Sequence, residues 1–148
     1  MKIVTITLNP ALDLTTRLEA MSLGEVNLVS EANLRAAGKG INVAMVLKDL
    51  GREVGVTGWL GADNEQSFVS LFAEWALDDH FVRVAGSTRI NVKISEQSGR
   101  VTDLNLPGLT IQQGEVSALE QAIDQLAPHT ECWRAASPKG WLPITAPI

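Results

Sequence analysis

Residues 36–44 read Ala-Ala-Gly-Lys-Gly-Ile-Asn-Val-Ala, and the other elements of the chain can be placed around this stretch. Glycine permits positive φ and close approach of the backbone to another group, so Gly38 and Gly40 predict a tight turn. Apolar side chains then recur at helical spacing over residues 42–50, which predicts a helix, and Gly51 is expected to end it.

The apolar positions of this helix define the face that we expect to meet the core. They lie at i, i+3, i+4 and i+7, which places them on one stripe of a helix. The stripe consists of Val43, Val46, Leu47 and Leu50.

A glycine turn that leads into a helix is also a candidate anion site. The first N–H groups of a helix have no partner inside it, and the helix dipole is positive at this end. Lys39 adds a full charge, so the turn suits a phosphate or a polyol. The alternative is an ordinary loop-to-helix turn with a solvated lysine, and spacing alone does not decide between them. The stretch matches neither the P-loop pattern nor Gly-x-Gly-x-x-Gly.

Composition narrows the classes of function. The chain has 148 residues, of which 45% are hydrophobic, enough for one sizeable core. The net charge is −5 and no basic run with interleaved aromatic residues occurs, which argues against nucleic-acid binding. Cys132 is the only cysteine, so an intramolecular disulfide is excluded. The sequence shows neither a signal peptide nor an apolar stretch of bilayer length, so we expect a cytoplasmic protein with no membrane partner.

Residues 2–8 are short and rich in β-branched side chains, which predicts a buried strand that ends at Asn9 and Pro10. Asp13 is then expected just beyond the C-terminal end of a strand, where open α/β sheets bind ligands. A carboxylate at this place can accept hydrogen bonds from two sugar hydroxyls. The alternative is that Asp13 caps a turn, and the local sequence fits both.

The middle of the chain alternates strand and helix patterns. Residues 53–61 predict a second core strand, and Asp63 or Asn64 can cap the helix that follows. Residues 81–84 predict a third strand. This order implies right-handed crossovers and a parallel sheet. The core-facing stripe of the intervening helix consists of Phe68, Leu71, Phe72 and Trp75.

Two other segments predict small β pairs. Residues 14–34 alternate weakly and predict a strand pair with one exposed face. Residues 88–95 and 100–106 predict a hairpin with a short glycine-containing turn. A last helix is expected over residues 114–126. The strand positions assigned within the first segment are Val26, Leu28 and Val29.

The first strand of the hairpin has a polar face. Arg89, Asn91 and Lys93 lie at i, i+2 and i+4 and so project to the same side. Two cations and an amide on one face can hold a phosphate and hydroxyls together. A solvated sheet face is the alternative, and for Lys93 it stays open because lysine is common on exposed strands.

Three of these segments resemble the signatures of the ribokinase-like (PfkB-type) sugar kinases. They are Thr-Ile-Thr-Leu-Asn-Pro-Ala-Leu-Asp at 5–13, Gly-Lys-Gly-Ile-Asn-Val-Ala at 38–44 and Thr-Arg-Ile-Asn-Val-Lys at 88–93. They occur in the order of the family and are most similar to its branch of 1-phosphofructokinases and tagatose-6-phosphate kinases. The resemblance covers residues 1–128.

This resemblance implies a fold and a reaction. The implied fold is ribokinase-like α/β, an incomplete parallel sheet with flanking helices plus a small β-lid from residues 14–36 and 86–108, through which intact members commonly form homodimers. The implied reaction is the ATP- and Mg²⁺-dependent conversion of fructose 1-phosphate to fructose 1,6-bisphosphate, with tagatose 6-phosphate as the alternative substrate. The residues that the resemblance places at the sugar phosphate are Asp13, Gly38, Lys39, Asn42, Arg89 and Asn91.

Residues 129–148 depart from the family pattern. The family continues with a buried strand and Ala-Gly-Ser-Leu-Pro-x-Gly, whereas this stretch holds two tryptophans and prolines at 138, 143 and 147. Reading the codons from Cys132 one base out of frame, with suitable synonymous codons, restores Ala-Gly-Ser-Leu-Pro-Lys-Gly. We therefore interpret the tail as frameshifted, with a genuine divergent C-terminus as the alternative. It is expected to be loosely packed and to leave one sheet edge bare.

The same departure sets the expected activity. The sequence contains no Gly-Ala-Gly-Asp, the turn that carries the catalytic aspartate and anion hole of the family. We therefore assign no catalytic, nucleotide-binding or metal residue, and expect a truncated chain that binds ATP and Mg²⁺ poorly and lacks kinase activity. The alternatives are a non-catalytic sugar-phosphate-binding or lid-pairing module, and a product without a stable fold.

Overall fold

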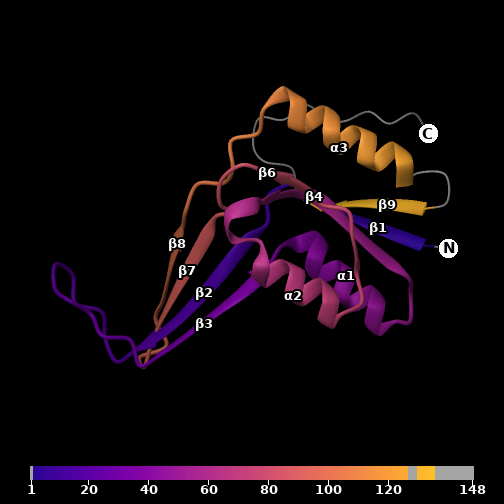
Figure 1. The fold of residues 1–148 in the computed structure, drawn as a ribbon. Helices are drawn as coiled ribbons and strands as arrows, with labels where there is room; N and C mark the ends of the chain where they lie inside the picture. Colours follow the sequence, from indigo (N-terminus) through magenta and orange to yellow (C-terminus); the bar gives the residue numbers. More distant parts are fainter. Residues whose placement is uncertain (1, 127–129, 136–148) are drawn as a thin grey trace.

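The computed structural model describes residues 2–126 and 130–135 (Figure 1). Its main sheet has the order β5-β4-β1-β9, with β6 also paired to β4, and each of these pairings is parallel. Its strands are β1 (Lys2–Thr7), β4 (Val54–Gly61), β5 (Asp78–Asp79), β6 (Val82–Val84) and β9 (Thr130–Ala135). The predicted parallel sheet is confirmed.

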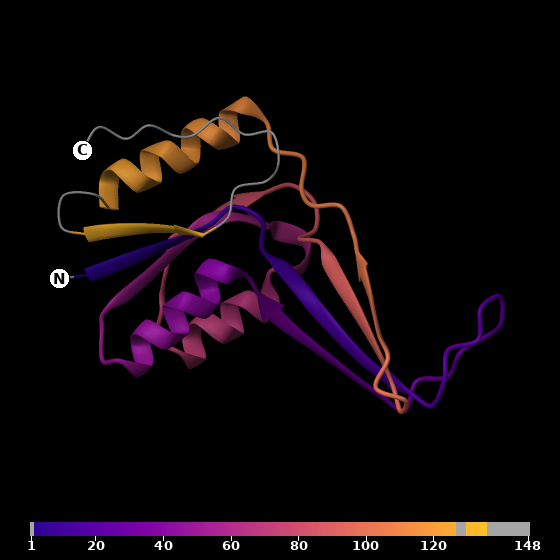
Figure 2. The ribbon, with the colours of Figure 1, turned by 180° about the vertical axis from the view of Figure 1, so that it is seen from behind.

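Helices cover both faces of this sheet. Figures 1 and 2 show α1 (Lys39–Asp49) and α2 (Gln66–Glu74) on one face and α3 (Gln113–Leu126) on the other. Every residue of β4 is buried, because this strand lies in the middle of the sheet and is covered on both sides. The predicted stripe of α2 is confirmed, with Phe68 and Phe72 buried and Leu71 and Trp75 packed beside them.

A second sheet projects from the first and forms the lid (Figure 1). Its order is β3-β2-β7-β8, with β2 and β7 parallel and the outer pairs antiparallel. Its strands are β2 (Ala11–Leu18), β3 (Glu31–Ala37), β7 (Ile90–Glu96) and β8 (Val101–Asn105). Both sequence segments assigned to a lid therefore meet in one sheet, which confirms the ribokinase-like arrangement.

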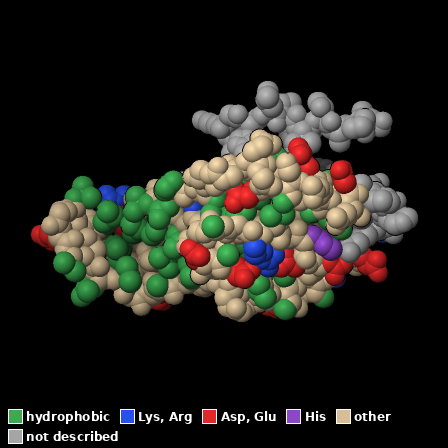
Figure 3. All heavy atoms as spheres, turned by 45° about the horizontal axis from the view of Figure 1, so that its top comes forward, with side chains coloured by type: hydrophobic (Ala, Val, Ile, Leu, Met, Phe, Trp, Pro, Cys, Tyr) green, Lys and Arg blue, Asp and Glu red, His purple; other side chains and the backbone are tan. Residues whose placement is uncertain are grey.

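The lid has one apolar and one polar face, because register partners in a sheet point to the same side. Leu34, Leu14, Val92 and Leu104 are successive register partners across all four strands and form an apolar row. Leu34 is 46% and Leu104 49% exposed. Figure 3 shows hydrophobic side chains gathered over this part of the molecule.

The structure corrects the predicted core face of α1. The helix begins at Lys39, and its buried residues are Gly40, Ile41 and Ala44. The inward face is set by Gly40, whose lack of a side chain lets this turn of the helix lie against β1. Leu47 packs partly against the core and Val43 is half-buried. The positions predicted to be core but found exposed are Val46 (59%) and Leu50 (68%).

The strand positions predicted at Val26, Leu28 and Val29 are wrong. These residues belong to a loop between β2 and β3, where Val26 is 90% and Leu28 86% exposed. The chain turns there because the Asn27 side chain bonds backbone groups of Ser22, accepting at 2.7 Å and donating at 2.8 Å. β2 instead finds its antiparallel partner in the later residues Glu31–Ala37.

The expectation that the tail adds nothing to the sheet is wrong for its first residues. β9 (Thr130–Ala135) pairs in parallel with β1 along its whole length. The edge of β1 offers unpaired backbone N–H and C=O groups, and an extended segment of any sequence without proline can satisfy them. The prolines at 138, 143 and 147 lie outside the described residues. Within the described part of the chain, no helix is long and apolar enough to cross a membrane.

Candidate functional site

The most definite feature of the predicted site is a pair formed by Asp13 and Asn91. Asp13 follows the C-terminal end of β1, as predicted, and lies within the next strand, β2, which starts directly after the turn at Asn9 and Pro10. Asn91 is its register partner on β7 and donates from Nδ2 to Asp13 Oδ1 at 3.0 Å. The Oδ1 of Asn91 is buried and has no hydrogen-bond partner among the described residues. The pair therefore offers the Asp13 carboxylate as an acceptor to hydroxyl groups, whereas the unpaired amide oxygen of Asn91 is buried and must be uncovered before it can accept.

Lys93 points to the same face of the lid but already has a partner. Its Nζ lies 2.6 Å from Oδ1 of Asp103, the residue opposite it on β8, and both side chains are about half exposed. A lysine neutralised by a neighbouring carboxylate is a weaker candidate for phosphate binding than a free one. The solvated-face alternative is the better account of Lys93.

The glycines before α1 are required by close packing. Gly38 has an extended φ of 162° and Gly40 lies inside the helix, so neither uses the left-handed φ that glycine permits, and what both use is the close approach of the backbone. A Cβ on Gly38 would lie 2.8 Å from Thr7 Cγ2, and one on Gly40 would lie 2.9 Å from the Ile6 carbonyl oxygen. The helix N-terminus is thereby seated against the C-terminal end of β1, the edge where such sheets bind ligands.

Lys39 and Asn42 stand in the first turn of α1, and both are exposed. No side chain caps the N-terminus of this helix, so its first N–H groups point outward together with the lysine. This end of the helix can attract an anion. No contact between these two side chains and the pair of Asp13 and Asn91 is described.

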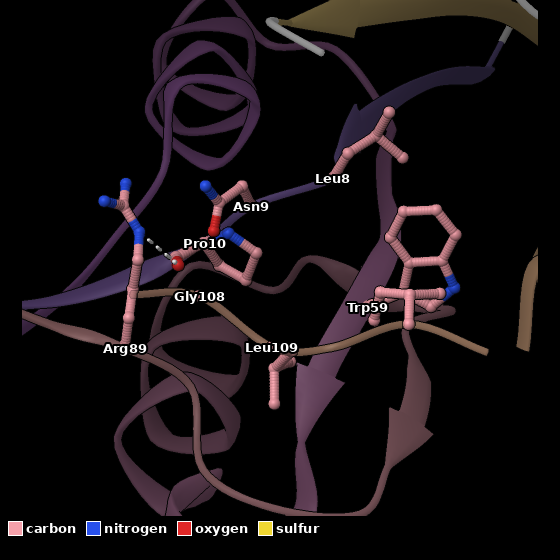
Figure 4. A pocket seen from close by; sticks show the side chains of 8 residues that line it. Leu8, Asn9, Pro10, Trp59, Arg89, Gly108 and Leu109 are labelled. Atoms are coloured by element: carbon pink, nitrogen blue, oxygen red, sulfur yellow. Dashed lines mark hydrogen bonds between the residues drawn. The ribbon is translucent and has the colours of Figure 1, made fainter. Parts of the chain in front are cut away.

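Arg89 lies at the junction of the lid and the main sheet, immediately before β7. Its Nε donates to the Pro10 carbonyl at 3.4 Å, and Arg89 is one of the residues that line a pocket (Figure 4). The pocket has a volume of about 220 Å³ and is also lined by Asn9, Trp59 and Gly108. Arg89 can therefore present a forked cation at the carboxyl ends of β1 and β4.

The position of Arg89 depends on Asn64, which the sequence predicted as a possible helix cap. That prediction is wrong for both candidates, because the N-cap of α2 is Glu65 and makes no side-chain cap hydrogen bond. Asn64 instead binds the backbone N–H and C=O of Thr88, each at 2.8 Å. Asn64 ends a short 3-10 helix, η1 (Ala62–Asn64), that links β4 to α2, and its partner could not be predicted from the local sequence.

Register shows which of the predicted residues the fold brings together. Ala11 pairs with Ala37 on β3, and Leu12 N–H bonds the carbonyl of Arg89. Gly38 and Arg89 thus flank the start of β2 from its two sides. Asp13 and Asn91 follow two residues further along, on the same face as Arg89. The register of β2 therefore brings Gly38, Arg89, Asp13 and Asn91 near one another, whereas Lys39 and Asn42 are placed only in the first turn of α1.

Residues 2–126 and 130–135 contain no group of three or more His, Cys, Asp or Glu side chains that could hold a metal ion.

The model of the pfkB family of carbohydrate kinases matches residues 6–129. The chain belongs to this family. A 1-phosphofructokinase of Vibrio cholerae is 52% identical over 126 residues, which cover 85% of this chain and 40% of that protein. A 1-phosphofructokinase of Escherichia coli K12 is 53% identical over 110 residues, or 74% of this chain and 35% of that protein. The chain therefore matches the N-terminal part of these pfkB kinases and spans well under half of their length.

Solved structures of this pfkB fold superpose closely. A candidate phosphofructokinase from Staphylococcus aureus has a TM-score of 0.86 at 30% identity, covering 95% of this chain and 45% of that one. A ribokinase of Thermotoga maritima has a TM-score of 0.62 at 17% identity, covering 72% of this chain and 36% of that one, and supports the fold alone.

Proposed function

We propose that the chain carries the sugar-phosphate site of a 1-phosphofructokinase, whose substrate is fructose 1-phosphate. The observation that carries the proposal is the hydrogen-bonded pair of Asp13 and Asn91, together with the exposed N-terminus of α1. Two relatives that are more than 50% identical over the matched region are 1-phosphofructokinases, which supports fructose 1-phosphate as the substrate. Tagatose 6-phosphate stays the alternative, because it too presents a phosphate and a ketohexose polyol.

Each candidate residue takes a role that follows from its chemistry. Asp13 accepts hydrogen bonds from sugar hydroxyls, and Asn91 both orients that carboxylate and, once uncovered, accepts a further hydrogen bond. Lys39, with the N–H groups that follow Gly38, and Arg89 provide positive charge for the phosphate. Asn42 adds an amide at the same helix end.

We further propose that the chain alone binds the sugar phosphate without turning it over, because its sequence contains no Gly-Ala-Gly-Asp turn, which carries the catalytic aspartate in the family that it resembles. We also propose a cytoplasmic location. We propose a homodimer that forms through the lid, and the apolar row from Leu34 to Leu104 supports this dimer.

The frameshift of the codons from Cys132 onward is likewise a proposal. It agrees with a family match that ends at residue 129, and sequencing of the gene tests it.

Binding of fructose 1-phosphate, measured by calorimetry without ATP, tests the main proposal. Lys39→Ala and Arg89→Ala should each weaken binding roughly ten- to a hundredfold, because a charge-assisted hydrogen bond contributes about 1.5–3 kcal/mol. Asp13→Asn should weaken sugar-phosphate binding while retaining most affinity for inorganic phosphate. Lys93→Ala is the matched control, since Lys93 shares the polar face but is paired with Asp103.

Two results would contradict the proposal. Equal losses in Lys93→Ala and Arg89→Ala would show that charge on this face acts without a defined site. Turnover of fructose 1-phosphate with ATP by the chain alone, at the roughly 1–100 per second of ordinary kinases, would contradict the proposed absence of catalysis.

A further inference from the structure

Two arginines on the polar face of the lid have no partner among the described residues. Arg17 on β2 and Arg35 on β3 are both exposed, and within residues 2–126 and 130–135 neither side chain makes an ion pair or a hydrogen bond. Lys93 lies on the same face but is neutralised by Asp103. The two arginines are therefore cations that stay available to a ligand.

Each arginine has a carboxylate as its register partner and does not bind it. Arg35 lies opposite Asp13 and Arg17 lies opposite Glu31, yet neither pair forms a salt bridge in the described chain. Opposite charges at facing positions of a sheet normally attract each other. Asp13 is instead held by Asn91. The two guanidinium groups thus keep their hydrogen-bond donors for another acceptor.

Both arginines line one pocket, which has a volume of about 520 Å³. Its other lining residues include Thr15, Asn33 and Ser95. Thr15 and Asn33 are register partners, and their row lies between the rows that carry the two arginines. Ser95 lies opposite Arg17 on β7. The pocket therefore combines two cations with hydroxyl and amide groups.

This set of groups suits a phosphate monoester that also carries hydroxyls. Guanidinium forks match phosphate oxygens, and serine, threonine and asparagine side chains can donate to the same oxygens. Glu31 lines the pocket too and would repel a second anionic group, but its carboxylate can accept a hydrogen bond from a hydroxyl. We propose that the pocket binds a phosphorylated polyol, with its phosphate between Arg17 and Arg35 and a hydroxyl at Glu31.

The pocket is separate from the sugar-phosphate site proposed above. None of the residues assigned to that site lines it. Arg17 lies four residues beyond Asp13 on β2, which is about 13 Å along the strand. The apolar row of the lid points to the opposite side of the sheet, so a lid dimer leaves the pocket open. The pocket therefore takes a second molecule, and this proposal does not rest on what binds at Asp13.

Titration of the isotope-labelled full chain with glycerol 3-phosphate at constant ionic strength tests the proposal. Nuclear magnetic resonance follows the backbone amides of Asn33 and Ser95, which should shift saturably with one shared midpoint. Arg17→Gln and Arg35→Gln should each raise that midpoint at least about tenfold, because each removes a charge-assisted hydrogen bond. Both side chains are exposed, so neither change should alter the melting midpoint of the chain. Glycerol, which lacks the phosphate, should cause no saturable shift.

Lys93→Gln is the matched control, since it removes a cation of the same face that is already paired, and it should leave the titration midpoint unchanged. Lys39→Ala should also leave it unchanged while weakening the sugar-phosphate site, so the two proposals can fail separately. Arg17→Lys keeps the charge without the fork and should raise the midpoint less than Arg17→Gln. The proposal is overturned if no saturable shift occurs, if Lys93→Gln and Arg35→Gln act equally, if Lys39→Ala raises the midpoint, or if inorganic phosphate binds as tightly as glycerol 3-phosphate.

Discussion

Asn64 holds the backbone of Thr88 at both of its polar groups. Its Oδ1 accepts from the Thr88 N–H and its Nδ2 donates to the Thr88 carbonyl, each at 2.8 Å. The Thr88 hydroxyl in turn accepts from the N–H of Gly61 at 2.9 Å. The residue before Arg89 is therefore fixed to the end of β4, which makes Asn64 a positioning residue for the cation of the proposed site.

Substitution of Asn64 tests this role. Asn64→Ala removes both hydrogen bonds and leaves polar groups of Thr88 without partners, which should lower the free energy of unfolding by about 1–3 kcal/mol. It should also weaken fructose 1-phosphate binding, because Arg89 loses its support. Denaturant unfolding and calorimetry measure the two effects. Gln66→Ala, an exposed change two residues away, is the control and should alter neither.

The case of Asn64 shows why part of the site could not be predicted from the sequence. Local pattern correctly predicted β1, β4 and β6 of the main sheet, since runs of β-branched residues report burial over a few positions, but it predicted neither β5 nor β9. It also placed Asn91 on a polar strand face. Contacts between residues far apart carry no such local signal: Asn64 and Thr88 are 24 residues apart, and Asp13 and Asn91 are 78. For Asn64, the local signal of a helix cap gave the wrong partner.

The exposed side of α1, which carries Val46 and Leu50, shows a different limit of sequence pattern. Helical periodicity identified Val46 and Leu50 as residues suited to a core, but periodicity cannot tell which of two apolar faces meets the sheet. The choice is made by Gly40, whose missing side chain permits close contact with β1. A prediction of the inward face needed that steric fact, which only the packing reveals.

Gly40 should accordingly tolerate no larger residue. In Gly40→Ala the new Cβ would lie 2.9 Å from the carbonyl oxygen of Ile6, a backbone atom that cannot move aside easily. Overpacking of this kind costs roughly 1–3 kcal/mol, so the free energy of unfolding should fall by that amount.

Gly114→Ala is the matched control for this change. Gly114 lies in α3, and a Cβ there would meet nothing within 4 Å. It should stabilise the chain by roughly 0.5–1 kcal/mol, because alanine favours the helix over glycine. Denaturant unfolding of both variants gives the comparison, and destabilisation of equal size in the two would contradict the steric account of Gly40.

The lid hairpin should lose stability in acid through Glu96. The Arg100 side chain donates to both carboxylate oxygens of Glu96, and these hydrogen bonds, with one from the Met21 backbone, hold the pKa of Glu96 below its usual range. A carboxylate whose pKa is lowered in the folded state stabilises that state above its unfolded pKa, about 4.3 for glutamate, and loses the contribution as pH falls through the folded value.

Glu96→Gln should therefore lower the melting midpoint at neutral pH and remove part of its fall below about pH 4.3. Melting curves of the parent chain and the variant at pH 3 to 7 measure the effect. Glu120→Gln, an exposed change on α3, is the control and should leave the pH profile unchanged. A constant gap between Glu96→Gln and the parent at every pH would show that the carboxylate charge contributes nothing.

Removal of β9 tests whether the tail belongs to the sheet. Deleting residues 130–148 removes the parallel ladder that pairs Lys2–Thr7 with Thr130–Ala135 and opens the edge of β1. Each lost backbone hydrogen bond contributes about 0.5–1.5 kcal/mol net, so the melting midpoint should fall clearly. The bare edge of β1 should also promote association, which light scattering detects.

Deletion of residues 136–148 alone keeps the whole ladder of β9 and is the matched control for this experiment. It should shift the melting midpoint much less than the longer deletion, because the backbone groups of β1 stay paired. The comparison separates the effect of the ladder from that of a shorter chain. If both deletions lower the midpoint equally, or neither does, then β9 does not stabilise the sheet and the edge of β1 tolerates exposure.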